Sequence, residues 1–299
     1  MFSSMRIAAA SAALAGLALC AAPAQAFVYG AYHVMPTPSY LAKMAKIGRA
    51  PVMNAGLMNY YGGSVFTSSK VVSVMWGFDV PSFTVNGVPA FTSALVNSIY
   101  VDQMAEYDTH LRGINGHRGT YQDIGRGTFV SQVTFTPRNK NTSLTDADIQ
   151  AELKHQIKVH NLPAPDLNTL YMIYFPKNVT INLDGLISCQ DFGAYHFATV
   201  DTKLSKKNIF YAVEPACTYG FSTITFIASH EFAEATTDNV PTPGSNPDFP
   251  QAWNDADGFE IGDKCGTSGT LTQGQNHFTV TQYFLNSTGQ CSTGDYTSP

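Results

Sequence analysis

Apolar runs separated by turn-forming residues divide this chain into alternating strands and helices. β-Branched or continuous apolar runs indicate buried strands, and alternation of apolar with polar residues indicates a half-buried one. The predicted strands cover 70–76, 129–135, 170–175, 192–200 and 208–213. Apolar positions at helical spacing predict a helix within 93–111. Thr145 and Asp148 mark the start of a second helix, which ends before a proline-rich segment at 162–165.

The most informative helical pattern lies at 221–238. An apolar run, 221–228, leads into His230, Glu231, Glu234 and Asp238, and prolines follow at 241 and 243. Residues four apart lie one above the other on a helix, so His230 and Glu234 point the same way. If the helix continues, Asp238 extends this stripe.

Helices and strands alternate without an internal repeat or a domain-boundary linker, which predicts one α/β (α+β) domain over 57–299. We expect a mixed central sheet packed on helices, one of which lies near 221–238. A Gly/Thr-rich β tail over 266–296 would close the domain. Residues 27–56 are rich in Tyr, Met and Pro without a clear period, which predicts an irregular N-terminal arm.

The first residues carry the signature of an export signal. Arg6 precedes the apolar run 7–19, and Ala24-Gln25-Ala26 is a cleavage motif, so 1–26 is interpreted as a signal peptide. Leu19 is too large to precede a lipidated cysteine, which argues against a lipoprotein with Cys20. No later apolar segment is long enough for a membrane span. The protein is expected to be secreted, or periplasmic if it is exported no further.

Composition narrows the function classes. Only 13% of the residues are charged, the net charge is −5, and no basic patch is present to neutralise phosphates, so nucleic acid is not an expected partner. Four cysteines follow the signal segment, and in an exported chain they predict two disulfides with three alternative pairings. Proximity along the chain favours Cys189 with Cys217 and Cys265 with Cys291.

The residues 230–234 form a His-Glu-x-x-Glu pattern, close to the His-Glu-x-x-His helix of zinc proteases. Glu234 replaces the second histidine, and a carboxylate oxygen is an acceptable zinc ligand. His230 and Glu234 are therefore candidate metal ligands, with Glu231 as the general base. This motif predicts a zincin-like fold with the metal-site helix near 221–238. The alternative is an ordinary helix that carries one histidine and several acids on a solvated face.

A catalytic zinc needs about three protein ligands and an open position for water. The candidates for the third ligand are His196, Asp238, Glu260 and Asp263. His196 ranks first because it follows a strand-like segment. Glu260 comes from a later segment, as the third ligand does in some zinc proteases.

Oxygen-bearing residues alternate around a glycine turn at 254–260. This pattern, which includes Asp255 and Asp257, is calcium-like, although the spacing to the last acid is too short for an EF-hand. Asp238, Asp255, Asp257 and Asp263 are thus candidates for a second cation or for a supporting role. The alternative is an Asp-Gly turn that merely reverses the chain.

A series of short segments resembles the phosphate-induced (Exordium-like) family, in its secreted bacterial branch with a His-Glu-x-x-Glu zincin-like helix. The matching segments are 57–65, 71–77, 106–109, 124–127, 169–176, 194–196, 229–238, 252–255 and 260–265. They follow the family's order over most of the chain after the signal. The resemblance implies export and a metallopeptidase-like site.

The sequence therefore predicts a zinc-dependent metallopeptidase-like hydrolase that acts on a peptide or protein substrate, with calcium as a second candidate cation. The alternative is a non-catalytic extracellular protein that binds cell-surface glycan or matrix, since aromatic residues can line sugar-binding surfaces. No Gly-x-Ser-x-Gly elbow is present, which argues against a serine hydrolase. The sequence does not fix the separation of two acids, so a glycosidase stays an open alternative.

Overall fold

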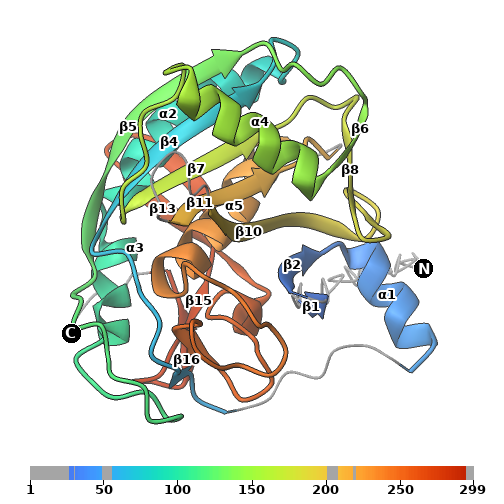
Figure 1. Cartoon of the computed structure of the whole chain (residues 1–299). Coiled ribbons are helices and arrows are strands. Elements are labelled where there is room, and N and C mark those ends of the chain that lie inside the picture. The colour runs from blue at the N-terminus through green and yellow to red at the C-terminus, as the bar shows by residue number, and fades with distance from the viewer. Residues whose placement is uncertain (1–26, 30, 49–55, 201–207, 218–219, 294–299) are drawn as a thin grey trace, which may run out of the picture.

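A computed structural model describes residues 27–29, 31–48, 56–200, 208–217 and 220–293. The predicted signal peptide, 1–26, lies outside the described residues. The centre of the molecule is a seven-stranded sheet in the order β1-β2-β10-β11-β7-β4-β5 (Figure 1). Its strands are β1 (Phe27–Tyr29), β2 (Tyr32–Pro36), β4 (Ser68–Trp76), β5 (Gly125–Phe135), β7 (Thr169–Tyr174), β10 (Phe192–Val200) and β11 (Asn208–Glu214).

The sheet is mixed. Strands β5, β4, β7 and β11 run parallel to one another, whereas the pairs β11–β10, β10–β2 and β2–β1 are antiparallel. Parallel strands are covered on both faces by helices, which explains the continuous apolar runs in β4 and β7. This arrangement confirms the mixed α/β class predicted from the sequence.

The two faces of the sheet carry separate cores. Helix α4 (Asp146–Lys158) packs on one face through Ile149, Leu153 and Ile157. Helices α2 (Ser82–Val96) and α5 (Phe221–Thr237) cover the other face. Successive side chains of a strand point to opposite faces, so each central strand contributes to both cores. The candidate metal residues belong to the α5 face.

Most of the predicted elements are present. The five predicted strands correspond to β4, β5, β7, β10 and β11, and Thr145 and Asp148 form a capping box at the start of α4. The single helix predicted within 93–111 is wrong. Helix α2 ends at Val96, and α3 (Ile99–Asp102) and the 3-10 helix η1 (Gln103–Tyr107) follow. The break occurs because Ser98 adopts an extended backbone and its hydroxyl binds the carbonyl of Leu95.

The N-terminal segment is more regular than predicted. Instead of an irregular arm, it forms β1, β2 and helix α1 (Pro38–Lys46), which Thr37 caps by accepting a hydrogen bond from the backbone N–H of Tyr40. Strand β2 pairs with β10 inside the sheet. Periodicity did not reveal β2 because its residues after Tyr32 are all buried, so no polar-apolar alternation marks the strand.

Shorter elements complete the chain. They are β3 (Asn59–Tyr60), β6 (Ser143–Thr145), β8 (Thr180–Leu183), β9 (Leu186–Ile187), β12 (Trp253–Asn254), η2 (Asp263–Cys265), β13 (Ser268–Gln273), β14 (Asn276–Thr281), β15 (Tyr283–Leu285) and β16 (Gln290–Ser292). The last four strands make two hairpins, as expected for the β tail. Within the described residues, no helix has the length and apolar character that crossing a bilayer requires.

The four described cysteines form two disulfides. Cys189 is bonded to Cys217, and Cys265 to Cys291. This confirms the pairing that sequence proximity favoured. The second disulfide joins η2 to strand β16 of the C-terminal hairpin, next to residues 260–263.

Candidate metal centre

Helix α5 passes through the interior of the molecule. Every residue from Ile227 to Thr237 is buried, and the apolar run that was predicted to lead into the helix forms its first half. One side packs on β10 and β11, and another packs on β14. A helix that is apolar or enclosed all round has no solvated face. The alternative of an exposed polar helix is therefore wrong.

His230 and Glu234 lie on one stripe of α5, as the spacing predicted. The Nε2 atom of His230 is 3.0 Å from Oε1 of Glu234 and 3.4 Å from Oδ1 of Asp263. His230 is 2% exposed and Glu234 is 1% exposed. Asp263 also donates its backbone N–H to Oε1 of Glu234 at 3.1 Å, which joins the later loop to the helix.

His196 reaches the same place from strand β10. Its Nδ1 atom is 3.4 Å from Oε2 of Glu231 and 3.7 Å from Oε2 of Glu234. Its Nε2 atom is 3.1 Å from the backbone carbonyl of Asp238, to which Nε2–H would donate. This hydrogen bond would leave the Nδ1 lone pair directed at the carboxylates, and metal-binding histidines are commonly oriented in this way.

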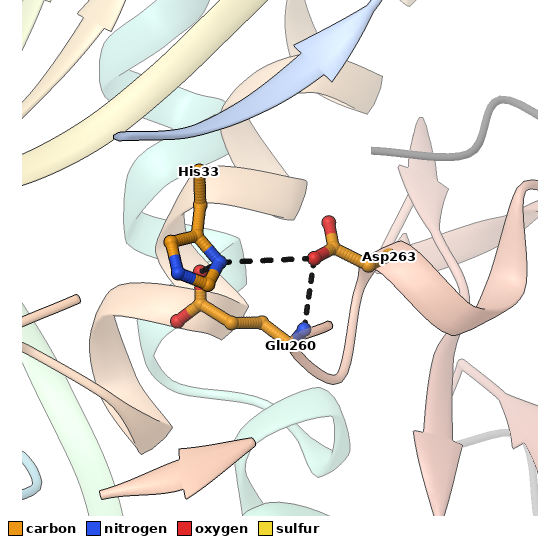
Figure 2. A group of neighbouring side chains, drawn as sticks. All are labelled: His33, Glu260 and Asp263. Atoms are coloured by element: carbon orange, nitrogen blue, oxygen red, sulfur yellow. Dashed lines mark hydrogen bonds and ion pairs between the residues drawn. The ribbon is translucent and has the colours of Figure 1, made fainter. Parts of the chain in front are cut away.

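A third histidine, His33 on strand β2, also lies at the site, and the sequence did not predict it. It is the register partner of His196 across the β2–β10 pair, so the two imidazoles come from adjacent strands. Figure 2 shows His33 beside Glu260 and Asp263: its Nδ1 atom is 2.9 Å from Oε2 of Glu260 and 4.0 Å from Oδ2 of Asp263. No local motif marks His33. Only the strand register brings it to the site.

Glu260 lies in the loop before η2, and Asp263 is the first residue of η2. The backbone N–H of Glu260 donates to Oδ2 of Asp263 at 2.8 Å, which fixes the two carboxylates relative to each other (Figure 2). Oε1 of Glu260 is 3.6 Å from Nε2 of His196. Gly262 lies between Glu260 and Asp263 in the sequence. It approaches α5 so closely that an added Cβ would be 2.8 Å from Nδ1 of His230 and 2.9 Å from Oε1 of Glu234. The loop therefore needs glycine at this position.

Glu231, the predicted general base, is fully buried beside His196. Neither of its carboxylate oxygens makes a hydrogen bond. A second buried acid, Glu214 at the end of β11, also has two oxygens without a hydrogen bond. Burial, and next the charge of Glu231, raise the pKa of Glu214 well above its ordinary value.

The remaining predicted residues lie outside this group of imidazoles and carboxylates. The side chain of Asp238 accepts hydrogen bonds from the backbone of Ala252 and from Asn254. Asp255 accepts the N–H groups of Asp257 and Phe259 and is 2.8 Å from Nζ of Lys264. Asp257 is exposed. Asp238 thus supports the site through its backbone carbonyl, and the calcium-like segment folds as a turn around Asp255.

Burial and the neighbouring charges shift the pKa values of the ionisable groups in the site. Burial, and next the charge of Asp263, raise the pKa of Glu234 well above its ordinary value, and burial raises the pKa of Glu260 to about 8. Burial is the largest influence on the pKa of Asp263 and raises it, but the interactions with His230, Glu234 and His33 together outweigh burial, so the net pKa is lowered. Conversely, burial lowers the pKa of His230, and its carboxylate neighbours, first Glu234, raise it well above the ordinary value.

The donor set fits a divalent cation. Three groups of side chains bring ligand atoms within 4.8 Å of one another: His33 with Glu260 and Asp263, His196 with Glu234 and Glu260, and His230 with Glu231 and Glu234. In the described residues, the buried atoms there that make no hydrogen bond include Nδ1 of His33, Nδ1 of His196, Nε2 of His230, both oxygens of Glu231 and Glu260, and Oδ1 of Asp263. Buried polar atoms are normally satisfied, and imidazole with carboxylate is a donor set that suits zinc.

Comparisons with family models, curated proteins and solved structures give no match for this chain. The resemblance to the Exordium-like family therefore stays a prediction. Conclusions about function depend on the geometry of the site.

Proposed function

We propose that this protein is a metal-dependent hydrolase, and more specifically an exported zinc metallopeptidase with a zincin-like metal helix. The observation that carries the proposal is the state of Glu231. Its carboxylate is 0% exposed, makes no hydrogen bond, and lies beside two histidines that offer unbonded ring nitrogens. A buried carboxylate without partners is costly unless it has a chemical role or a bound cation nearby.

His230, Glu234 and His196 are the residues that would hold the zinc. Glu234 lies between the two histidines, with its Oε1 facing His230 and its Oε2 facing His196. Two histidines and one glutamate are a ligand set of catalytic zinc sites. A zinc ion supplies Lewis acidity: it lowers the pKa of a bound water and polarises a substrate carbonyl.

Glu231 then acts as the general base. Its free oxygens accept a proton from the attacking water and return it to the leaving amine when the C–N bond breaks. Asp238 positions His196 through its backbone carbonyl. The peptide bond is proposed as the substrate because the His-Glu pair on a helix is the arrangement that zinc proteases use.

The test is a Glu231→Gln substitution, with zinc content and cleavage of a mixed peptide substrate measured together. We expect the variant to keep its zinc and its thermal midpoint while hydrolysis falls by about 10²–10⁴-fold, the usual contribution of a general base. Asp257→Asn changes an exposed carboxylate in the neighbouring turn and should leave both quantities unchanged. Undiminished hydrolysis by Glu231→Gln would exclude this role.

A second candidate function is supported by the burial of the site. All the ligand side chains are at most 2% exposed, which suits a cation that stabilises the fold of a non-catalytic extracellular protein with glycan or matrix partners. In that case, purified protein would bind zinc and lose stability on chelation but cleave no peptide. Binding to immobilised cell-surface glycans would then support this alternative.

A further inference from the structure

The three histidines and three of the carboxylates alternate around a closed ring. Each carboxylate uses its two oxygens on two different histidines. Glu260 faces His33 with Oε2 at 2.9 Å and His196 with Oε1 at 3.6 Å. Glu234 faces His230 with Oε1 at 3.0 Å and His196 with Oε2 at 3.7 Å. This pattern differs from isolated ion pairs, in which each acid serves one partner.

Asp263 closes the ring. Its Oδ1 atom is 3.4 Å from Nε2 of His230, and its Oδ2 atom is 4.0 Å from Nδ1 of His33. The six-residue ring is therefore His33, Glu260, His196, Glu234, His230 and Asp263. It divides into two sets of three that share no residue.

We propose that the ring binds two neighbouring divalent cations. The first set, His230, Glu234 and His196, is the zinc site of the proposed function, on which this inference rests for one of the two ions. The second set, His33, Glu260 and Asp263, is a separate cation site built from strand β2 and the η2 loop (Figure 2). The two ions would be neighbours, because Asp263 of the second set also contacts His230 of the first.

The balance of charge favours two ions over one. Four carboxylates, those of Glu231, Glu234, Glu260 and Asp263, are each at most 1% exposed. The ammonium of Lys264, the residue after Asp263, is 2.8 Å from Oδ2 of Asp255, which is not one of these four carboxylates. With all four ionised, one divalent cation would leave two negative charges in a buried space, whereas two cations would neutralise them, and uncompensated buried charge is strongly unfavourable.

The second set also contains buried atoms that make no hydrogen bond, which is an observation separate from the balance of charge. His33 is 1% exposed and its Nδ1 atom makes no hydrogen bond, although Oε2 of Glu260 lies 2.9 Å away. Both oxygens of Glu260 are also without a hydrogen bond. Ligand atoms that bind one cation lie close to one another without forming hydrogen bonds, as these atoms do. In two-metal hydrolases, such neighbouring ions clamp the attacking and leaving groups.

The experiment is a titration of metal-free wild-type protein with zinc, followed by calorimetry and elemental analysis after desalting. We expect two equivalents per chain in the wild type and one in His33→Ala. His277→Ala, which alters an exposed histidine of the β tail, should keep two. One equivalent in the wild type, or two in His33→Ala, would overturn the proposal.

A spectroscopic measurement on the unmodified protein covers the case in which His33→Ala fails to fold. With Mn²⁺ as the probe, two neighbouring ions should give the exchange-coupled electron paramagnetic resonance spectrum of a pair. A spectrum of isolated ions at saturation would contradict the proposal. Two zinc ions without hydrolysis would reject the hydrolase and keep the pair, whereas one zinc ion with Glu231-dependent hydrolysis would do the reverse.

Discussion

Two groups of buried polar residues lie back to back on the same strands of the central sheet. On the α4 face, Asp146 accepts hydrogen bonds from the hydroxyls of Tyr195 and Tyr211 at 2.7 Å, from Tyr32 at 3.1 Å and from Gln150 at 2.7 Å. On the α5 face lies the six-residue ring with its unbonded atoms. Tyr32 and Tyr195 precede His33 and His196 directly, so strand alternation sends one residue of each pair to each face.

The two groups differ in whether their buried polar atoms make hydrogen bonds, and this difference distinguishes a structural role from a candidate binding site. Around Asp146, the carboxylate has donors for both oxygens, so burial is compensated without a ligand. In the ring, acids face histidines without completing hydrogen bonds. Burial of polar groups alone therefore does not indicate a ligand-binding site. Buried polar atoms that lie close together without hydrogen bonds do indicate one.

The strongest test of this comparison is Asp146→Ala. We expect it to lower the free energy of unfolding by about 3–5 kcal/mol, because buried tyrosine hydroxyls lose their acceptor. The loss should be the same in zinc and in EDTA when measured by urea denaturation. A loss that disappears in EDTA would show that Asp146 acts through the metal site, and Asp146→Asn, which keeps one acceptor oxygen, should lose less.

The pH dependence of the metal-free protein should come from the ring. Because the pKa of Glu260 is raised to about 8 from 4.5, the folded state holds this proton more tightly than the unfolded state. The stability is therefore fully present below about pH 4.5 and is lost as the pH rises through 8, by about 3 kcal/mol between pH 5 and 8. Urea denaturation in EDTA measures this loss. Glu260→Gln should flatten the profile; an equally steep profile in that variant would assign the loss to other groups.

Zinc should stabilise the ring and leave the Asp146 group unaffected. At a free zinc concentration of 100 times Kd, a single site adds about 2.7 kcal/mol to the free energy of unfolding. The thermal midpoint of the wild type should rise accordingly, and chelation should reverse the rise. His196→Ala should remove most of this response, whereas His155→Ala, on α4, should retain it. A full response in His196→Ala would exclude His196 as a ligand.

The Gly262→Ala substitution should weaken zinc binding, although it changes none of the proposed ligand residues. The added Cβ would lie 2.8 Å from His230 and 2.9 Å from Glu234, so one of them must move. We expect zinc affinity to fall by about 10–100-fold, corresponding to about 1.4–2.7 kcal/mol. Gly220→Ala, at the N-terminus of the same helix, meets no atom within 4 Å and is the matched control. Equal zinc affinities of the two variants in calorimetry would contradict the steric argument.

The smallest effect is expected for Asp257→Ala. Asp257 is exposed and lies outside the three metal-ligand groups, so its removal should change stability by less than about 0.5 kcal/mol in zinc or calcium. The thermal midpoint with and without calcium is the measurement. A calcium-dependent stabilisation lost in this variant would contradict this expectation and support the calcium interpretation of the 254–260 segment.

Local pattern in the sequence determined the mixed α/β class, the central strands, the capping box of α4 and the stripe that aligns His230 with Glu234. These features are readable because strand and helix periods are set by residues two to four apart. Proximity along the chain also gave the correct disulfide pairing, since each pair closes a short loop.

Only the tertiary structure decided which residues complete the site. His33 reaches it because β2 pairs with β10 in a register that places it opposite His196, and strand register across a long separation has no local signature. Asp263 and Glu260 join because the η2 loop folds onto α5 at Gly262. The sequence supplied candidate donors one by one. Their convergence, which leaves several of their buried side-chain atoms without a hydrogen bond, follows from packing contacts between segments far apart in the chain.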